Sequence, residues 1–382
     1  MRDLDRPTRV PLEDAADLSG LDRAKIFAAP EDPGDRPAWR AALTRWRDGA
    51  GPPPRYPAWT RNCFAVCVAW LWDTFLYDSG RGVFTPETFL AHGVREFGGY
   101  DAVVLWHAYP VIGLDGRDQF AFYRDVPGIA MLVAALRRRG VRVLLDYNPW
   151  AAGGEPHAEA LAALVDDLGA DGVFLDTLRE GGTDLRTALG PDVALESESA
   201  VPLGRVPDHA MSWAQWFGDS ATPGVLRTKW FERRHMLHHT RRWHRDHSDE
   251  LHSAWMNGCG ILVWENVFGS WVGWNARDRA LLRAMLPVQR RFARLFHSGE
   301  WTPLVDEAAP WLPASRWSDG DTTLWTVVNR SGRPYEGPLL GVDPGVECHD
   351  AVTGARLGPG AYGRIQARGV GAVEGAPGGA PP

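Results

Sequence analysis

Four short apolar runs in the middle of the chain each end on an acidic residue. They cover residues 141–145, 173–175, 193–195 and 261–264, and they end on Asp146, Asp176, Glu196 and Glu265. A strand buried on both faces has no room for a charge in its middle, but its open end can carry one. The pattern is therefore typical of a parallel barrel whose site lies at the carboxyl ends of its strands.

The same region alternates between strand-like and helix-like segments, which predicts βα units and a parallel sheet. Eight strands are predicted, at residues 62–70, 102–107, 141–146, 173–176, 193–196, 209–215, 225–231 and 261–265. Helices are predicted between them, among others at residues 126–139, 157–168, 183–189, 248–257 and 276–296. This order predicts a (β/α)8 TIM barrel over residues 58–299.

The two ends of the chain differ from the barrel region. Residues 1–57 are rich in Pro, Asp and Arg, with one helix-like segment at 37–48, and we expect an N-terminal extension packed on the barrel. Residues 300–370 hold short strand-like runs separated by turns, which predicts a small antiparallel β-sandwich. The Gly-, Ala- and Pro-rich residues 371–382 are expected to form a disordered tail.

Composition narrows the class of protein. The 382 residues are 45% hydrophobic and 23% charged, with a net charge of −7 and no basic block, which argues against nucleic acid as a main partner. No stretch approaches the roughly 18 apolar residues of a membrane span. The start of the chain lacks a signal peptide pattern, and the four Cys do not form a disulfide framework, so a cytoplasmic location is expected. The sequence leaves the oligomeric state open.

Nineteen Trp residues are the unusual feature of the composition. Some are expected to fill the core and others to line a cleft, because the wide face of Trp stacks on sugar rings. Residues expected to contact a carbohydrate substrate lie at the predicted strand ends: Trp106, His107, Asp146, Asn148, Trp150, Glu198, Trp264 and Trp271. For His107 a purely structural role is an equal alternative.

Paired carboxylates on different strands are what glycoside cleavage needs. One attacks or steadies the oxocarbenium-like centre, and the other protonates the leaving oxygen. We assign Asp176 as the nucleophile and Glu196 as the acid/base, with Glu265 as the competing acid/base. Other interpretations stay open. Asp176 could instead cap a helix, Glu198 could be a residue at the rim of the site, and Glu265 could only hydrogen-bond to sugar hydroxyls. This chemistry requires no cofactor, and we assign no metal site.

Three motifs resemble strand ends of retaining glycosidases with the α-amylase or α-galactosidase type of barrel. They are Val-Leu-Leu-Asp146-Tyr-Asn148, Asp-Gly-Val-Phe-Leu-Asp176 and Leu-Glu196. The resemblance implies a C-terminal β-sandwich and a nucleophilic Asp at the end of strand four. The chain departs from the amylase pattern at Phe174, where that pattern has an Arg, and at Pro149, where it has a His. The run from Trp264 to Trp271 also resembles a group of uncharacterised bacterial barrel proteins.

Two rival functions follow from the same sequence. One is a carbohydrate-binding barrel that does not catalyse. The other is a metal-dependent hydrolase that uses residues 235–252, which hold six of the twelve His. His235 and His239 have the spacing that holds a metal on a helix, but the Glu of the zinc motif is missing. We expect this run to be a helix on the barrel wall.

Overall fold

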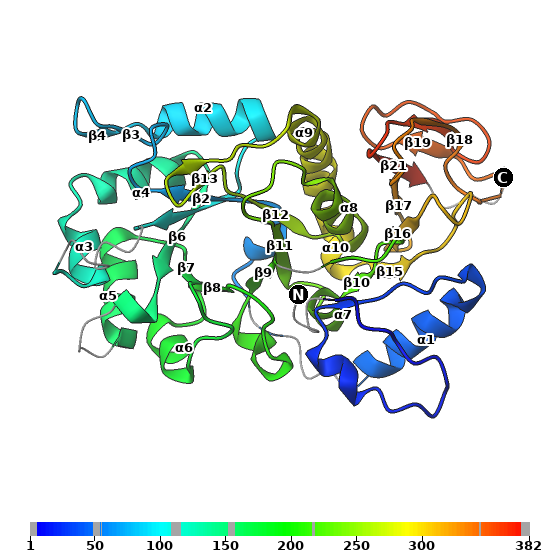
Figure 1. Cartoon of the computed structure of the whole chain (residues 1–382), viewed down its shortest axis with the longest axis horizontal. Helices are drawn as coiled ribbons and strands as arrows, with labels where there is room; N and C mark the ends of the chain where they lie inside the picture. The colour runs from blue at the N-terminus through cyan, green and yellow to red at the C-terminus, as the bar shows by residue number, and fades with distance from the viewer. Residues whose placement is uncertain are drawn as a thin grey trace.

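A closed barrel of eight parallel strands forms the centre of the computed structural model (Figure 1). The structure describes residues 6–48, 54, 56–107, 116–151, 157–215, 218–343 and 345–375. The barrel strands, in chain order, are β2 (Ala65–Trp70), β5 (Ala102–Trp106), β6 (Arg142–Tyr147), β7 (Gly172–Leu175), β8 (Ala194–Ser197), β9 (Met211–Gln215), β11 (Met236–Thr240) and β12 (Gly260–Val263). Each pairs with the next, and β12 pairs back onto β2. The predicted (β/α)8 barrel is confirmed.

Helices follow the strands and cover the barrel on the outside (Figure 1). Helix α4 shows why they form: its buried residues Ile129, Leu132, Val133 and Leu136 recur at helical spacing and face the core. The helices of this layer are α2 (Pro86–Phe97), α3 (Gln119–Asp125), α4 (Ile129–Arg138), α5 (His157–Leu168), α6 (Thr183–Leu189), α7 (Arg227–Phe231), α8 (Ser248–Asn257), α9 (Ala276–Arg291) and α10 (Ala293–Ser298). Short β-hairpins β3–β4 (Tyr77–Asp78, Val83–Phe84) and β13–β14 (Asn266–Val267, Ser270–Trp271) extend from the loops.

The seventh barrel strand is not where the sequence pattern placed it. Residues 225–231, expected to be this strand, form the two-residue β10 (Val225–Leu226) and helix α7. The strand is instead β11, in the His-rich run that was expected to be a helix. All five residues of β11 are buried. The polar ring of His238 can be buried because it hydrogen-bonds to Glu196 and to the Cys63 carbonyl inside the barrel.

The C-terminal region is an antiparallel sheet of five strands in the order β15-β16-β17-β21-β19, with a separate pair β18-β20. These strands are β15 (Glu300–Pro303), β16 (Ala314–Ser318), β17 (Thr323–Val328), β18 (Tyr335–Pro338), β19 (Cys348–Asp350), β20 (Tyr362–Ile365) and β21 (Val370–Gly375). A small core of its own, including Leu312, Val327 and Val373, lies against this sheet. The predicted β-sandwich after the barrel is confirmed.

Strand β21 corrects the expected tail. Residues 371–375, expected to be disordered, pair with β17 along its whole length. The last of them must be a glycine, since a Cβ at Gly375 would lie only 2.6 Å from the ring of Trp325. The remaining residues of the expected tail, 376–382, lie outside the described residues.

The N-terminal segment packs against both other regions (Figure 1). It contains β1 (Ile26–Phe27), which pairs with β10, and helix α1 (Arg36–Arg47). The indole of Trp230 on α7 donates to the Leu43 carbonyl of α1 at 2.8 Å, and Arg40 donates to the Leu304 carbonyl beyond β15 at 2.8 Å. The described part of the chain also contains the short 3-10 helices η2 (Ser19–Arg23), η3 (Pro33–Asp35), η4 (Thr60–Asn62), η5 (Pro149–Ala151) and η6 (Leu203–Asp208). Among the described residues, no helix is long and apolar enough to cross a membrane.

Candidate active site

Strand register brings Asn148, Asp176 and Glu198 to the same edge of the barrel. Leu175, the last residue of β7, pairs with Tyr147 of β6 on one side and with Ser197 of β8 on the other. One residue further along, the Asn148 amide donates to Asp176 Oδ2 at 3.0 Å, and the Thr177 backbone NH donates to Glu198 Oε2 at 2.8 Å. Two acidic residues therefore follow neighbouring strands at the carboxyl end of the barrel, which is where this fold places its active sites.

Asn148 is fixed in its position by helix α3 and by its own loop. Its backbone NH donates to Gln119 Oε1 at 3.0 Å, and Gln119 Nε2 donates back to the Asn148 carbonyl at 2.8 Å. The Trp150 backbone NH donates to Asn148 Oδ1 at 2.9 Å. The side-chain oxygen is thereby occupied, so the amide nitrogen is the group that reaches Asp176.

Asp146 and His107 form a buried pair next to these residues. Asp146 Oδ2 lies 3.2 Å from His107 Nε2, and both side chains are fully enclosed. Burial first, and then the charges of Asp176 and Glu198, raise the pKa of Asp146 well above its usual value. Burial lowers the pKa of His107 to about 4. Burial thus favours the uncharged form of both side chains.

Aromatic side chains and an arginine border Glu198. Arg242, just after β11, donates to Glu198 Oε1 at 3.2 Å, and its guanidinium lies 5.3 Å from the ring centre of Trp264 and 5.7 Å from that of Phe268. Trp243 stacks on Phe268 with ring centres 5.9 Å apart. We call Trp243, Trp264 and Phe268 the aromatic platform. Trp243 is 52% and Phe268 42% exposed, so part of the platform is accessible to solvent.

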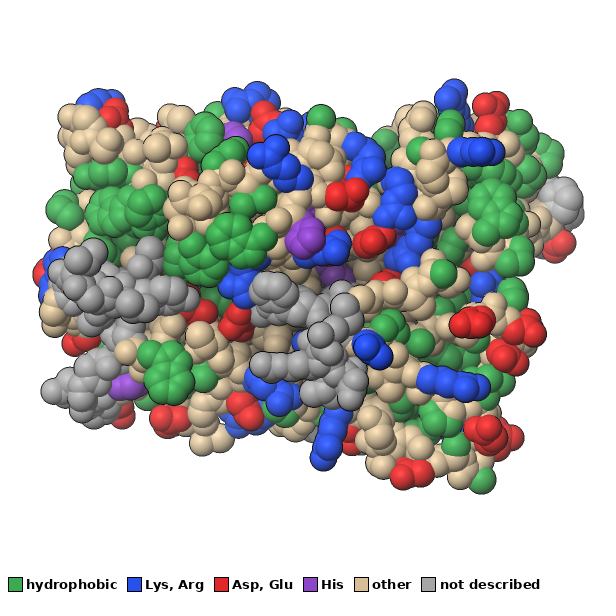
Figure 2. All heavy atoms as spheres, in the orientation of Figure 1, with side chains coloured by type: hydrophobic (Ala, Val, Ile, Leu, Met, Phe, Trp, Pro, Cys, Tyr) green, Lys and Arg blue, Asp and Glu red, His purple; other side chains and the backbone are tan. Residues whose placement is uncertain are grey.

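The sequence did not indicate Arg242, Trp243 or Phe268 as site residues. Arg242 and Trp243 were hidden because the seventh strand was placed too early, and residues that follow β11 were taken for the middle of a helix. On the face shown in Figure 2, hydrophobic side chains gather over the half of the molecule that holds the barrel strands. A correct position for β11 would have found Arg242 and Trp243, whereas Phe268 follows β12, which the sequence pattern did locate.

Strained backbone marks the same strand ends. Thr177, Ala200, Trp243 and Phe268 have φ values of 64°, 48°, 67° and 51°. They lie in the loops that follow β7, β8, β11 and β12. A left-handed conformation is unfavourable for residues other than glycine, costs about 1–3 kcal/mol and clusters at functional sites. Leu304, Asp306, Ala361 and Arg368 in the C-terminal region also have positive φ values, so the strain is not confined to the edge that carries Asp176 and Glu198.

Glu196 does not join this group. It is fully buried, and its Oε1 lies 2.5 Å from Nδ1 of His238. The other ring nitrogen of His238 lies 2.8 Å from the carbonyl of Cys63, which precedes β2 at the amino end of the barrel. The structure therefore places Glu196 inside the barrel, one pleat below Glu198, and this position does not suit the acid/base role that the sequence indicated.

Glu265 also lies apart from Asp176. Its Oε2 lies 2.6 Å from Nε2 of His92 on helix α2, so the carboxylate is turned toward the outer helix layer. Trp271 packs near the same histidine, with ring centres 6.1 Å apart, and is 50% exposed. Glu265, the competing acid/base, and Trp271, an expected substrate-binding residue, therefore both lie where the loop after β12 packs against α2.

The remaining expected contacts fall into two groups. Trp106 is 5% exposed and lies under the platform, with its ring centre 5.2 Å from Phe268 and 5.8 Å from Trp264. Trp150 is 83% exposed on the loop after β6. Trp106 therefore supports other aromatic rings, whereas Trp150 presents its face to solvent beside Asn148.

The His-rich run does not assemble a metal site. His235 hydrogen-bonds to Ser212 Oγ and to the His209 carbonyl, both at 2.8 Å, and His252 to the Arg368 carbonyl at 3.0 Å. In the part of the chain that the structure describes, no three His, Cys, Asp or Glu side chains are grouped so that they could hold a metal ion. The metal-dependent alternative therefore has no ligand set among these residues.

Replacing Glu196 by Gln is expected to destabilise the fold, since breaking a buried ion pair costs about 3–5 kcal/mol. Burial lowers the pKa of His238, but the charge and hydrogen bond of Glu196 outweigh it and raise that pKa overall. A raised histidine pKa contributes stability that is complete below about pH 6.5 and is lost as the pH rises through the folded-state value.

Urea unfolding of the wild type and Glu196→Gln from about pH 6 to about pH 9 measures this contribution. We expect the difference between the two proteins to be largest at the acidic end and to shrink as the pH rises. A difference that is small and independent of pH would show that the pair does not stabilise the barrel as described.

Comparison with known proteins identifies relatives of the fold only. No protein-family model and no curated protein sequence matches the chain. Similar solved structures include an Anoxybacillus α-amylase (TM-score 0.58, 10% identity, covering 84% of this chain and 99% of that one) and a maltogenic α-amylase from Thermotoga neapolitana (0.55, 12%, 83% and 99%). A GH27 β-L-arabinopyranosidase from Geobacillus stearothermophilus is also similar (0.52, 11%, 85% and 99%). The chain thus has a glycoside hydrolase-like (β/α)8 barrel followed by a C-terminal β-sandwich.

Proposed function

We propose that the protein is a retaining glycoside hydrolase that cleaves the O-glycosidic bond of an oligosaccharide or glycoside. Asp176 is the nucleophile, and Glu198, in place of Glu196 or Glu265, is the acid/base. The observation that carries the proposal is that Asp176 and Glu198 follow neighbouring barrel strands at the same edge, with the NH of Thr177, the residue after Asp176, donating to Glu198 at 2.8 Å. Glycoside hydrolysis of this type requires two carboxyl groups that flank the glycosidic bond.

The proposed reaction has two steps. Asp176 attacks the anomeric carbon, and Glu198 gives its proton to the leaving oxygen as the glycosidic bond breaks. Water then attacks the glycosyl ester of Asp176, and Glu198 takes the proton of this water, which restores both carboxyl groups. The hydrogen bond from Asn148 at 3.0 Å orients Asp176 for the attack, and the bond from Arg242 at 3.2 Å holds Glu198.

The surroundings of Glu198 support a carbohydrate on the leaving-group side. The acid must lie beside the leaving oxygen, and Arg242 connects Glu198 directly to the aromatic platform. The exposed parts of the Trp243 and Phe268 rings suit the apolar face of a sugar ring. Solved structures with the same fold include amylases and an arabinopyranosidase, which fits a sugar substrate but does not specify the sugar.

Turnover of aryl glycosides tests the proposed function. Purified protein is incubated with 4-nitrophenyl α- and β-glycosides of glucose, galactose and arabinopyranose, and nitrophenol release is followed. We expect hydrolysis of at least one member of the panel. Calorimetric binding of these sugars without turnover of any of them would instead favour the non-catalytic carbohydrate-binding barrel.

A further inference from the structure

Helix α3 is tied to the ends of two barrel strands by two buried side chains. Gln119 and Tyr123 are four residues apart, so they lie on one face of the helix, and they are 1% and 0% exposed. The Tyr123 hydroxyl donates to the Leu105 carbonyl of β5 at 2.5 Å and accepts from the Asp146 NH of β6 at 3.2 Å. Helix α3 is thus anchored at the carboxyl edge of the barrel, beside the candidate site.

Gln119 binds the backbone of Asn148 with both ends of its amide. Its Oε1 accepts from the Asn148 NH at 3.0 Å, and its Nε2 donates to the Asn148 carbonyl at 2.8 Å. An amide that meets an NH and a carbonyl of the same residue has only one orientation that satisfies both. Gln119 lies 29 residues before Asn148, so these bonds fix the loop after β6 from outside that loop.

Asn148 connects Gln119 to Asp176. Its side-chain oxygen accepts from the Trp150 NH at 2.9 Å, and its amide nitrogen donates to Asp176 Oδ2 at 3.0 Å. The backbone of Asp176 is held separately, because its NH donates to the Tyr147 carbonyl at 2.9 Å. Since a carboxylate is planar, a bond that fixes one of its oxygens also sets the direction of the other. The position of Asn148 therefore determines how the Asp176 carboxylate is turned.

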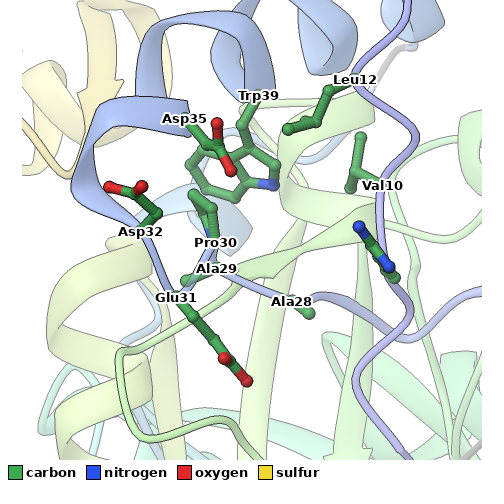
Figure 3. Close-up of a pocket in the computed structure, with 10 residues that line it drawn as sticks. Val10, Leu12, Ala28, Ala29, Pro30, Glu31, Asp32, Asp35 and Trp39 are labelled. Atoms are coloured by element: carbon green, nitrogen blue, oxygen red, sulfur yellow. The ribbon is translucent and has the colours of Figure 1, made fainter.

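The N-terminal segment takes no part in this arrangement. It contains a hollow of about 480 Å³, which Figure 3 shows with Asp35 and Trp39 at the start of α1. The lining of this hollow includes no residue of α3, of a barrel strand or of a loop that follows one. The contacts from Gln119 through Asn148 to Asp176 therefore belong to the barrel and its own helix layer.

We propose that Gln119 is a positioning residue for the nucleophile. It holds Asn148 so that the Asn148 amide keeps the Asp176 carboxylate at the angle needed for attack on the anomeric carbon. Misplacement of a reacting group by about 1 Å can cost about 10²-fold in rate, so a residue that acts only through Asn148 can still control the reaction. The inference rests on the proposed hydrolysis at Asp176, and its test therefore includes a measurement that does not need turnover.

Gln119→Met keeps the length of the side chain and removes both bonds to Asn148. It is expected to lower kcat on the best aryl glycoside about tenfold and to leave KM close to that of the wild type, because Gln119 does not bind the sugar. Gln289→Met is the matched control. Gln289 on α9 is equally buried, and its Nε2 donates to the Cys259 carbonyl at 2.8 Å, just before β12 and at the opposite end of the barrel. This control loses a buried bond of the same kind and is expected to keep wild-type kcat.

A double-mutant cycle tests whether Gln119 acts through Asn148. Asn148→Ala removes the bond to Asp176 and is expected to lower kcat at least about tenfold. Adding Gln119→Met to Asn148→Ala is expected to change kcat by less than about twofold, because the residue that transmits the effect is already gone. Gln119→Glu keeps the acceptor for the Asn148 NH, and it is measured in the same two backgrounds, with the same expectation, if the Met variant does not fold.

Three kinetic results would overturn the proposal: wild-type kcat in the folded Gln119 variant, an equal loss in Gln289→Met, or a further loss of more than about twofold in the double variant. If the wild type hydrolysed no glycoside, the proposed function would fail, and crystal structures would decide the role of Gln119 by themselves. In the Gln119 variant the Asn148 amide is expected to move away from Asp176. An unchanged hydrogen bond between Asn148 and Asp176 would show that Gln119 does not position the carboxylate.

Discussion

Asp176→Asn is expected to lower kcat for glycoside hydrolysis by at least about 10³-fold, because an amide cannot form the glycosyl ester. The substitution keeps the size of the side chain, and its carbonyl oxygen can still accept the hydrogen bond from Asn148. The fold should therefore persist, and thermal unfolding of the variant should resemble that of the wild type. Initial rates on the best substrate of the aryl glycoside panel measure the effect.

A matched control separates this effect from a general loss of charge. Asp125 on α3 has a side chain that is 57% exposed and pairs with Arg117 at the surface. Asp125→Asn removes one carboxylate from the same domain and is expected to retain wild-type kcat. If Asp176→Asn kept a substantial share of activity while folded, Asp176 would not be the nucleophile.

Glu198→Gln is expected to lower kcat on a natural glycoside by about 10²–10⁴-fold, the usual contribution of a general acid. The loss should depend on the leaving group. A dinitrophenolate leaves without a proton, so the first step on a dinitrophenyl glycoside should be nearly unaffected, whereas a sugar alkoxide needs the acid. Comparison of single-turnover rates on the two kinds of substrate measures this dependence.

Glu196→Gln is the discriminating control for this experiment. Because Glu196 is enclosed with His238, its loss is expected to reduce the folded fraction but to leave kcat per folded molecule close to that of the wild type. The opposite outcome, with Glu198→Gln active and folded Glu196→Gln inactive on sugar leaving groups, would return the acid/base role to Glu196.

The sequence predicted those parts of the barrel whose pattern is local. β6, β7, β8 and β12 are apolar runs that end on or shortly before a polar residue, and the structure has them within a few residues of the expected bounds. β11 was missed because its histidines are polar and the spacing of His235 and His239 is that of neighbours on a helix. Their partners, such as Glu196 for His238, are 42 residues away in the chain, and no local pattern shows them.

The sequence could not show which carboxylate is the acid/base, again because the deciding partners are distant in the chain. Alternation along β8 puts Glu196 and Glu198 on one face, and only His238 from a distant strand separates the enclosed residue from the one at the rim. Glu265 is likewise taken by His92, 173 residues earlier. Asp176 was identifiable because its position, the first residue after a buried strand, depends on nearby residues alone.

Trapping of the glycosyl ester tests the central claim most directly. A fluorinated glycoside with a good leaving group, in the sugar series that the enzyme hydrolyses, slows the second step so that the covalent intermediate accumulates. Peptide mass mapping of the inactivated protein should then find one sugar on the peptide that contains Asp176, and none in Asp176→Asn. A sugar attached to Glu196, Glu198 or Glu265 instead would contradict the account.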